Sequence, residues 1–342
     1  MPAKPPTIND WRTLYAAAAA FINAKCWEHV DSDHIFGVRP APGETYYCGI
    51  LGYYHDTYGF AVYQEPPDFL RLRQDNGDDG DVFYELRGII MYLGPKAGLD
   101  AEDRRVTEQI GFTPGMRGKW PLFRSMCPGF HPWYLEWDEA RIMTVCLTQA
   151  VAVAARSAVK HNLLARDRRD RILIRAAAPD EAGSAWNGLR ESMPPAVETK
   201  DPGPMPVLNQ FKLRRVANIT RQRRGRWEAD YFFAPAPLRD AENVRPYYPY
   251  YILIIDGETG IIIGQKIARH AEVHTDLAEL MLDVMIQTGS IPRQLLARRM
   301  EVSAALAPIL QELGIQMEMV KNLEIMDLAR RDLQEFMREG RF

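Results

Sequence analysis

The 342-residue sequence has few cysteines and almost no excess of charge of either sign. Its four cysteines are Cys26, Cys48, Cys127 and Cys146; none form a Cys-x-x-Cys pair, which argues against a disulfide framework or a zinc site. The chain has 42 basic and 45 acidic residues, a formal net charge of -3, so no overall field favours nucleic acid or an anionic membrane. Binding of either kind would need a local cluster of charge.

Long apolar runs and nucleotide-binding loops are also missing. Residues 1–7 lack the apolar stretch of a signal peptide, and the weakly polar run 140–155 is too short and too polar to span a bilayer. The sequence has no Gly-x-x-x-x-Gly-Lys loop, and no Gly-x-Gly-x-x-Gly follows a predicted strand. These features predict a cytoplasmic protein with no membrane partner, and they give no sign of a cofactor.

Chain length and the distribution of proline predict two domains, since a domain has ~100–200 residues. Five prolines lie between Met193 and Pro206, and proline at that density prevents regular structure. We therefore expect an N-terminal domain over 1–192, a Pro-rich linker over 193–206 and a C-terminal domain over 207–342.

The N-terminal half has the pattern of an α+β domain. A helix is expected to begin at Asn9 or Asp10, and a long helix is expected over about 138–162. Between them, short apolar runs alternate with turn residues, which is typical of an antiparallel meander. The runs are 34–38, 46–52, 59–63 and 88–93.

The C-terminal half begins with predicted strands and then alternates helices with strands. Strands are expected over 207–219, 226–233, 250–255 and 261–267. Three helices then alternate with two short strands, up to about residue 339. Antiparallel hairpins followed by βα units predict a mixed sheet flanked by helices, so we expect an α/β arrangement here.

Four stretches of the C-terminal half carry a family resemblance: Trp227-Glu228-Ala229-Asp230, the run 251–260, the segment 289–292, and Leu313-Gly314-Ile315. Together they resemble the integrase-type core of the ribonuclease-H-like superfamily. In that family an aspartate on the first strand, another after the fourth strand and a carboxylate on a late helix hold two divalent metals. The resemblance therefore implies Mg²⁺, because hard oxygen ligands suit that ion and paired metals steady the attacking and leaving oxygens.

The carboxylates match this pattern only in part. Asp230 falls at the first position, and Asp332 or Glu335 could supply the third. At the second position the sequence departs from the family, because 294–300 has no acid and Arg298 and Arg299 would repel a metal. Two hypotheses follow: a degenerate core retained for binding, with no metal or catalysis, or a metal-dependent nuclease or strand-transfer enzyme with an unusual ligand set.

A basic run at the start of the C-terminal half suggests a third hypothesis, a nucleic-acid binder without catalysis. Seven cations with no acid among them could contact phosphates, although a solvated basic surface has the same pattern. They are Lys212, Arg214, Arg215, Arg221, Arg223, Arg224 and Arg226.

The N-terminal half has an aromatic, proline-rich corner between residues 120 and 133. Arg124 could clamp an anion beside Trp120 and Trp133, which would make the corner a site for a small ligand or a protein partner. The alternative is a packed corner in which prolines fix the backbone and the rings fill the core.

The same corner carries a second resemblance. Its Trp-Pro-x-Phe-Arg-Ser and Pro-Gly-x-x-Pro-Trp motifs occur with Lys25-Cys26-Trp27, Ile35-Phe36-Gly37-Val38 and the run 59–63. These features resemble the N-terminal domain of an uncharacterised bacterial family, and the C-terminal half resembles a domain of unknown function that accompanies it. No activity is implied by the resemblance to these two domains of unknown function, so a non-enzymatic binding or interaction protein is the favoured interpretation.

Overall fold

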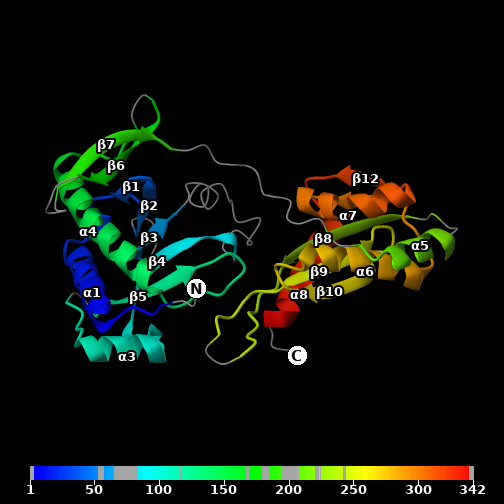
Figure 1. The fold of residues 1–342 in the computed structure, drawn as a ribbon, viewed down its shortest axis with the longest axis horizontal. Coiled ribbons are helices and arrows are strands. Elements are labelled where there is room, and N and C mark those ends of the chain that lie inside the picture. Colours follow the sequence, from blue (N-terminus) through cyan, green and yellow to red (C-terminus); the bar gives the residue numbers. More distant parts are fainter. Residues whose placement is uncertain are drawn as a thin grey trace. The chain divides into compact units, whose positions relative to one another are not determined.

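A computed structural model gives the fold (Figure 1). It describes residues 4–52, 58–64, 84–115, 118–166, 169–178, 185–193, 206, 208–219, 223, 225–241 and 244–338. The chain divides into two compact units, one of Met1–Pro128 with Pro132–Ala196 and the other of Gly129–His131 with Val197–Phe342. Most of the linker expected over 193–206 lies outside the described residues, so its boundaries stay a prediction.

The first unit contains a seven-stranded sheet in the order β5-β4-β3-β2-β1-β6-β7. Strands β1 to β5 pair antiparallel in chain order, which confirms the predicted meander. Strand β6 pairs parallel to β1 and antiparallel to β7, so the sheet is mixed. The strands are β1 (Ile35–Ala41), β2 (Glu44–Leu51), β3 (Tyr58–Tyr63), β4 (Gly88–Gly94), β5 (Trp120–Met126), β6 (Arg171–Ala177) and β7 (Trp186–Ser192).

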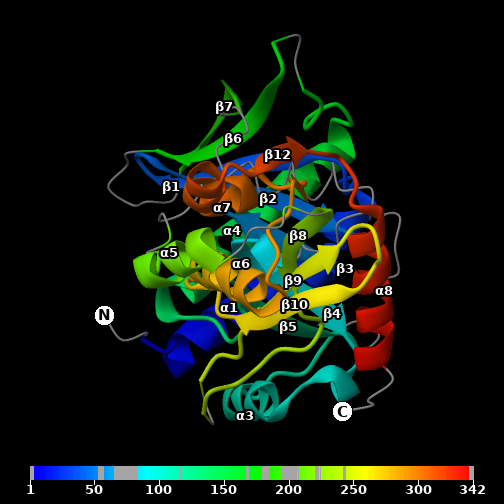
Figure 2. The same ribbon diagram turned by 90° about the vertical axis from the view of Figure 1, so that its right-hand side faces the viewer.

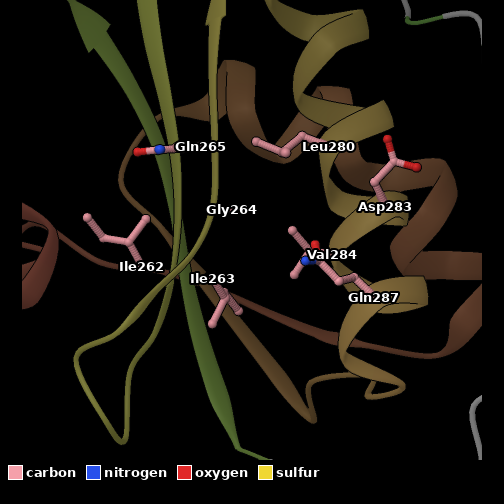
Figure 3. Close-up of a pocket in the computed structure, with 8 residues that line it drawn as sticks. All are labelled: Ile262, Ile263, Gly264, Gln265, Leu280, Asp283, Val284 and Gln287. Carbon is pink, nitrogen blue, oxygen red and sulfur yellow. The ribbon is translucent and has the colours of Figure 1, made fainter.

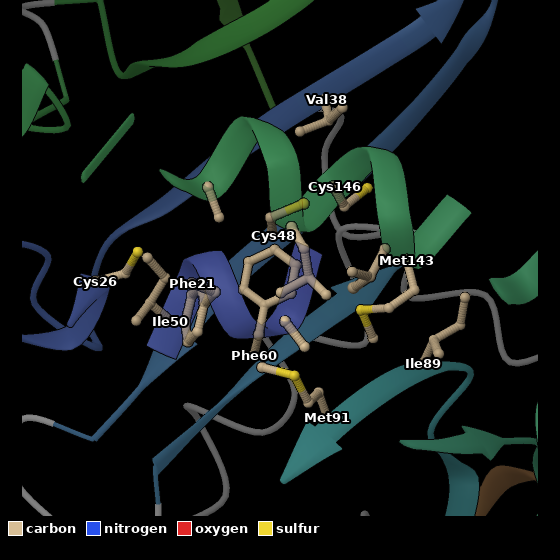
Figure 4. Packing of buried hydrophobic residues seen from close by; sticks show 14 of the residues in the cluster. Phe21, Cys26, Val38, Cys48, Ile50, Phe60, Ile89, Met91, Met143 and Cys146 are labelled. Carbon is tan, nitrogen blue, oxygen red and sulfur yellow. The ribbon is translucent and has the colours of Figure 1, made fainter. Parts of the chain in front are cut away.

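Helices α1 (Ile8–Asn23) and α4 (Trp137–Val159) cover one face of this sheet, and α3 (Ala101–Ile110) packs beside α1. Capping boxes start α1 at Thr7 and α3 at Asp100, because each cap side chain accepts from a backbone N–H three residues later. Figure 4 shows side chains of α1 and α4 meeting those of β2 and β3 in the core.

Among the described helices, α4 is the one that is long and apolar enough to cross a membrane. Its residues Met143, Cys146 and Leu147 are completely buried against the sheet. This is the packing of a core helix.

The second unit contains a five-stranded sheet in the order β10-β9-β8-β11-β12. Strand β9 pairs antiparallel with both β8 and β10, whereas β11 runs parallel to β8 and β12. The elements, in chain order, are α5 (Gln210–Ile219), β8 (Arg226–Phe233), β9 (Tyr250–Asp256), β10 (Ile262–Ala268), α6 (Val273–Thr288), β11 (Gln294–Ala297), α7 (Met300–Leu313), β12 (Gln316–Met319) and α8 (Glu324–Arg338). The predicted mixed sheet flanked by helices is confirmed.

The strand expected over 207–219 is wrong, because most of this segment forms helix α5. Leu213 and Val216 are its buried residues, and their spacing of three suits one face of a helix. The Asn209 side chain accepts from the backbone N–H groups of Phe211 and Lys212, which caps the helix at its start.

Helices lie on both faces of the second sheet. Helices α6 and α7 pack against each other on one face, and Figure 2 shows α8 on the opposite side. Under α8, Phe232, Leu253 and Ile255 of the sheet form a buried cluster with Leu323 and Met326. The central strand β8 is therefore covered on both faces, and its polar side chains need partners within the unit.

Candidate functional site

Asp230 lies on the central strand β8 and is completely buried. The Arg298 Nε lies 2.6 Å from Asp230 Oδ2, and the Arg299 Nε lies 3.3 Å from Oδ1. The backbone N–H of Tyr231 also donates to Oδ1, at 2.9 Å. Because β11 runs parallel to β8 and pairs Gln294 with Arg226, continuing the register places Arg298 beside Asp230.

Arg298 also contacts a second carboxylate, on helix α8. Its Nη1 donates to Asp327 Oδ1 at 2.6 Å, so the guanidinium bridges two acids from different elements. Burial opposes the charge, but the two carboxylates outweigh it and raise the pKa of Arg298 above its usual value. The buried Nη2 has no hydrogen-bond partner among the described residues. We call Asp230, Arg298, Arg299 and Asp327 the Asp230 cluster.

Aromatic and imidazole rings border the Asp230 cluster. The Arg299 guanidinium carbon lies 5.3 Å from the centre of the Tyr231 ring, and the Tyr231 hydroxyl is 3.2 Å from His274 Nε2. Burial lowers the pKa of His274, an effect that His270 reinforces and Glu301 opposes. Since the rings occupy the space next to Arg299, the cluster is packed into the fold.

Glu228, two residues before Asp230 on β8, is a second buried acid. Its Oε2 accepts from the backbone N–H of Met326 at 3.0 Å, in the first turn of α8. Burial raises the pKa of Glu228, and the nearby Asp327 and Glu324 add to the effect. Glu228 therefore anchors the start of α8 against the sheet.

The structure brings one acid of α8 to the Asp230 cluster, and it is neither of the two that the sequence analysis named. Asp332 and Glu335 are exposed, whereas Asp327 reaches Arg298. Asp332 lies five residues after Asp327, which turns its side chain about 140° around the helix. Asp327 follows Met326, which is completely buried against the sheet, and the sequence contains no signal that singles it out from the other acids of the helix.

The residues around Asp230 do not fit a divalent cation. Guanidinium groups already contact both of its carboxylate oxygens, and two fixed positive charges there oppose a metal ion. Within the described part of the chain, no three His, Cys, Asp or Glu side chains are grouped so that they could hold a metal.

The basic run is divided in the structure. Lys212 forms ion pairs with Glu279 and Asp283 of α6, at 2.6 and 2.7 Å. Arg223 donates to the carbonyls of Leu313 and Gly314, and so caps the end of α7.

The other five cations of the run are not all described. Arg214 and Arg215 are exposed on α5, and Arg226 is exposed at the start of β8. Arg221 and Arg224 lie outside the described residues. Two of the seven cations, Lys212 and Arg223, therefore contact other parts of the unit, and the proposed phosphate contacts stay a prediction.

The aromatic corner does not converge on Arg124. Two parallel hydrogen bonds, of 2.9 and 2.7 Å, join its guanidinium to Asp103, and Nη2 also lies 3.0 Å from Asp100 Oδ2. Trp120 begins β5, while Trp133 pairs with Ser125 near the end of that strand. Trp120 and Ser125 are five residues apart on β5. At about 3.3 Å per residue, this places the two tryptophans roughly 16 Å apart along the strand.

Both tryptophans are half-buried and have neighbours of their own. Trp120 packs against Phe112 at 5.8 Å, and Trp133 packs against Tyr134 at 4.9 Å between ring centres. Gly129–His131 belong to the second unit, where Phe130 forms a β-bridge with Tyr247. Arg124 therefore holds α3 to β5, and the two rings form separate packing sites.

A groove of about 450 Å³ runs between the edge strand β10 and helix α6 (Figure 3). Ile262, Ile263 and Gly264 line it on the strand side, opposite Leu280 and Val284 of the helix. No described strand pairs with the outer edge of β10. The apolar side chains at this edge are unusually exposed: Ile261 is 61%, Ile262 44% and Ile267 56% exposed.

The two halves of the chain match different family models. Residues 11–175 match the model described as "Domain of unknown function (DUF7309)", and residues 212–334 match "Domain of unknown function (DUF6930)". The chain resembles two domains of unknown function in tandem. The DUF7309 match runs from α1 into β6, and the DUF6930 match runs from α5 into α8. No curated protein and no solved structure matches the chain.

Proposed function

We propose that the chain is a non-enzymatic binding or interaction protein whose DUF6930-like unit is a ribonuclease-H-like core that has lost its metal site. The observation that carries this proposal is the bridging of Asp230 and Asp327 by Arg298. Asp230 lies on the first strand of the sheet, Arg298 follows the fourth, and Asp327 lies on the last helix. These are the three places where the resemblance puts metal-binding carboxylates.

The charge of the Asp230 cluster supports the absence of catalysis. A two-metal site uses several carboxylates to neutralise divalent cations that activate the attacking and leaving oxygens. Here the Arg298 guanidinium supplies the positive charge between Asp230 and Asp327. Unlike a metal ion, a guanidinium cannot coordinate a water molecule or a substrate oxygen. The cluster therefore joins β8, β11 and α8 as a structural centre.

The edge of β10 supports the interaction role. An exposed edge strand offers unpaired backbone groups, and contiguous apolar side chains beside it favour contact with another chain. Ile262 and Ile267 are exposed at this edge, and Ile262 also lines the groove along α6. The proposed binding unit thus combines the Asp230 cluster in its interior with an exposed apolar edge at β10.

A nuclease assay tests this proposal. The full chain is incubated with single- and double-stranded DNA and with RNA, in Mg²⁺ or Mn²⁺, beside the variants Asp230→Asn and Asp332→Asn. We expect no cleavage above background for any of the three proteins. Metal-dependent cleavage that Asp230→Asn abolishes and the exposed control Asp332→Asn retains contradicts the proposal.

A further inference from the structure

The first unit contains a buried arginine that pairs with no acid in the described part of the chain. Arg175 of β6 is 8% exposed, and its charge is therefore largely removed from water. Its Nε donates to Gln149 Oε1 at 3.2 Å, and its Nη1 donates to the backbone carbonyl of Trp186 at 3.0 Å. Both acceptors are neutral, so these contacts hold the guanidinium in place without balancing its charge.

A second cation reinforces this charge. Arg156, in the last turn of α4, is exposed and forms no ion pair with a described carboxylate. Burial lowers the pKa of Arg175, and the positive charge of Arg156 adds to the effect. The one acid of β7, Glu191, pairs with Arg39, and Asp170, directly before β6, pairs with Arg166. Among the described residues, these two positive charges therefore have no counterion.

Gly188 leaves the space above these cations open. It pairs with Arg175 across β6 and β7, and it is exposed. A Cβ atom at this position would lie 4.0 Å from the Nη1 atoms of both Arg156 and Arg175, so one point is near both guanidinium groups. Trp186 lies two residues away on the same face of β7 and is half-buried in the core beside α4.

We propose that Arg156 and Arg175 bind the phosphate group of a small phosphorylated ligand in the space over Gly188. A phosphate monoester carries close to two negative charges at neutral pH. This charge matches two arginines that have no acidic partner among the residues the structure describes, whereas a carboxylate would neutralise only one of them. The guanidinium fork suits the geometry of phosphate oxygens. This inference concerns the DUF7309-like unit and does not depend on the loss of a metal site in the other unit.

Calorimetric titration of the full chain with inorganic phosphate, at low ionic strength, tests the proposal. Three variants accompany the wild type: Arg156→Ala removes the exposed cation, Gly188→Glu places a carboxylate beside both arginines, and Arg166→Ala is the matched control. Arg166 is an exposed arginine that already pairs with Asp170. Gly188 has no positive φ and meets only ordinary contacts, so the glutamate fits.

We expect phosphate to bind the wild type and Arg166→Ala equally, and to bind Arg156→Ala at least about tenfold more weakly, because one charged hydrogen-bond donor is lost. Gly188→Glu should abolish binding and raise the thermal unfolding temperature, since it supplies the missing anion. Equal phosphate affinity in the wild type, Arg156→Ala and Gly188→Glu would overturn the proposal. The proposal would also be overturned if the protein bound an oligonucleotide but not inorganic phosphate, and if Arg156→Ala weakened that oligonucleotide binding.

Discussion

The Arg298 guanidinium and the Asp230 carboxylate lie 2.6 Å apart in the interior of the second unit, and the same guanidinium reaches Asp327. Asp230 is completely buried and Arg298 is 19% exposed, so solvent screens this pair only weakly. A buried carboxylate needs partners within the protein to replace the water it has lost, so the position of Asp230 depends on its guanidinium contacts. The ion pair therefore bears on two measurable properties, the free energy of unfolding and the ability of Asp230 to bind a metal ion.

Replacing Arg298 with methionine should destabilise the protein strongly. The substitution leaves the buried Asp230 with Arg299 as its remaining cationic contact, at 3.3 Å. Breaking a buried pair by removing one partner costs about 3–5 kcal/mol. Urea unfolding followed by circular dichroism measures the change, with Arg214→Ala, an exposed arginine, as a control expected to shift by less than about 0.5 kcal/mol.

The double variant Asp230→Asn/Arg298→Met should recover part of that loss. It removes both charges together, and the asparagine oxygen can still accept from the Tyr231 N–H. We expect a coupling energy of about 1–3 kcal/mol in the double-mutant cycle. Strictly additive effects of the two substitutions would show that the ion pair is not formed in solution.

Glu228 should make stability depend on pH in the acid range. Burial raises its folded-state pKa above the ordinary value of about 4.3, so the folded protein binds more protons than the unfolded chain between the two values. Stability contributed by this group is therefore present below pH ~4 and is lost as the pH rises through the raised pKa.

The variant Glu228→Gln removes this ionisation while keeping an oxygen that can accept from the Met326 N–H. Its stability relative to wild type should increase as the pH rises from about 4 and then level off. Denaturant unfolding at a series of pH values measures the difference, with the exposed Asp332→Asn as the control. A difference that is constant with pH, or that grows toward acid, would be inconsistent with a raised pKa.

Arg124 should prove to be a structural residue. Its substitution by alanine leaves Asp103, which is 7% exposed, without its bidentate partner, at a cost of about 3–5 kcal/mol. Lysine should recover only part of the loss because it cannot form two parallel bonds. The control Arg105→Ala breaks an exposed pair with Glu102 and should cost less than about 1 kcal/mol. Unchanged stability in Arg124→Ala would instead leave Arg124 available for an anionic ligand.

The β10 edge should mediate weak self-association. Its exposed isoleucines, and an outer edge with which none of the described strands pairs, favour pairing with a second copy, whereas lysine on an edge strand prevents such pairing. Sedimentation velocity over a range of concentrations should show association for the wild type and less for Ile262→Lys/Ile267→Lys. Met300→Lys alters an exposed apolar residue outside β10 and should behave as wild type. Identical profiles for all three proteins would count against this edge as a binding surface.

The sequence predicted the strands of the second sheet well because their apolar runs are distinct. Tyr250–Asp256 and Ile262–Ala268 form a hairpin around a tight turn, as expected. Helix α5 was predicted as a strand because the basic residues beside Leu213 and Val216 obscure a short helical pattern. Local patterns thus identified the long apolar elements and failed where few residues are buried.

The site was harder to predict because its partners are distant in the chain. Arg298 could be recognised as a residue that repels a metal, but its pairing with Asp230 depends on the register of β8 and β11. The choice of Asp327 depends on which side of α8 faces the sheet, and spare acids elsewhere on the helix obscure that choice. The burial of Arg175 could not be predicted, because an arginine in a strand usually reaches solvent. Its burial depends on a contact with Gln149, which is distant in the sequence.

The most direct test of the central claim is a calorimetric Mn²⁺ titration of the wild-type chain beside Asp230→Asn and Asp332→Asn. If Arg298 occupies the place of the metal, the three proteins will give the same titration, with no stoichiometric site that depends on Asp230. Stoichiometric Mn²⁺ binding by the wild type and by Asp332→Asn, lost in Asp230→Asn, would contradict the account.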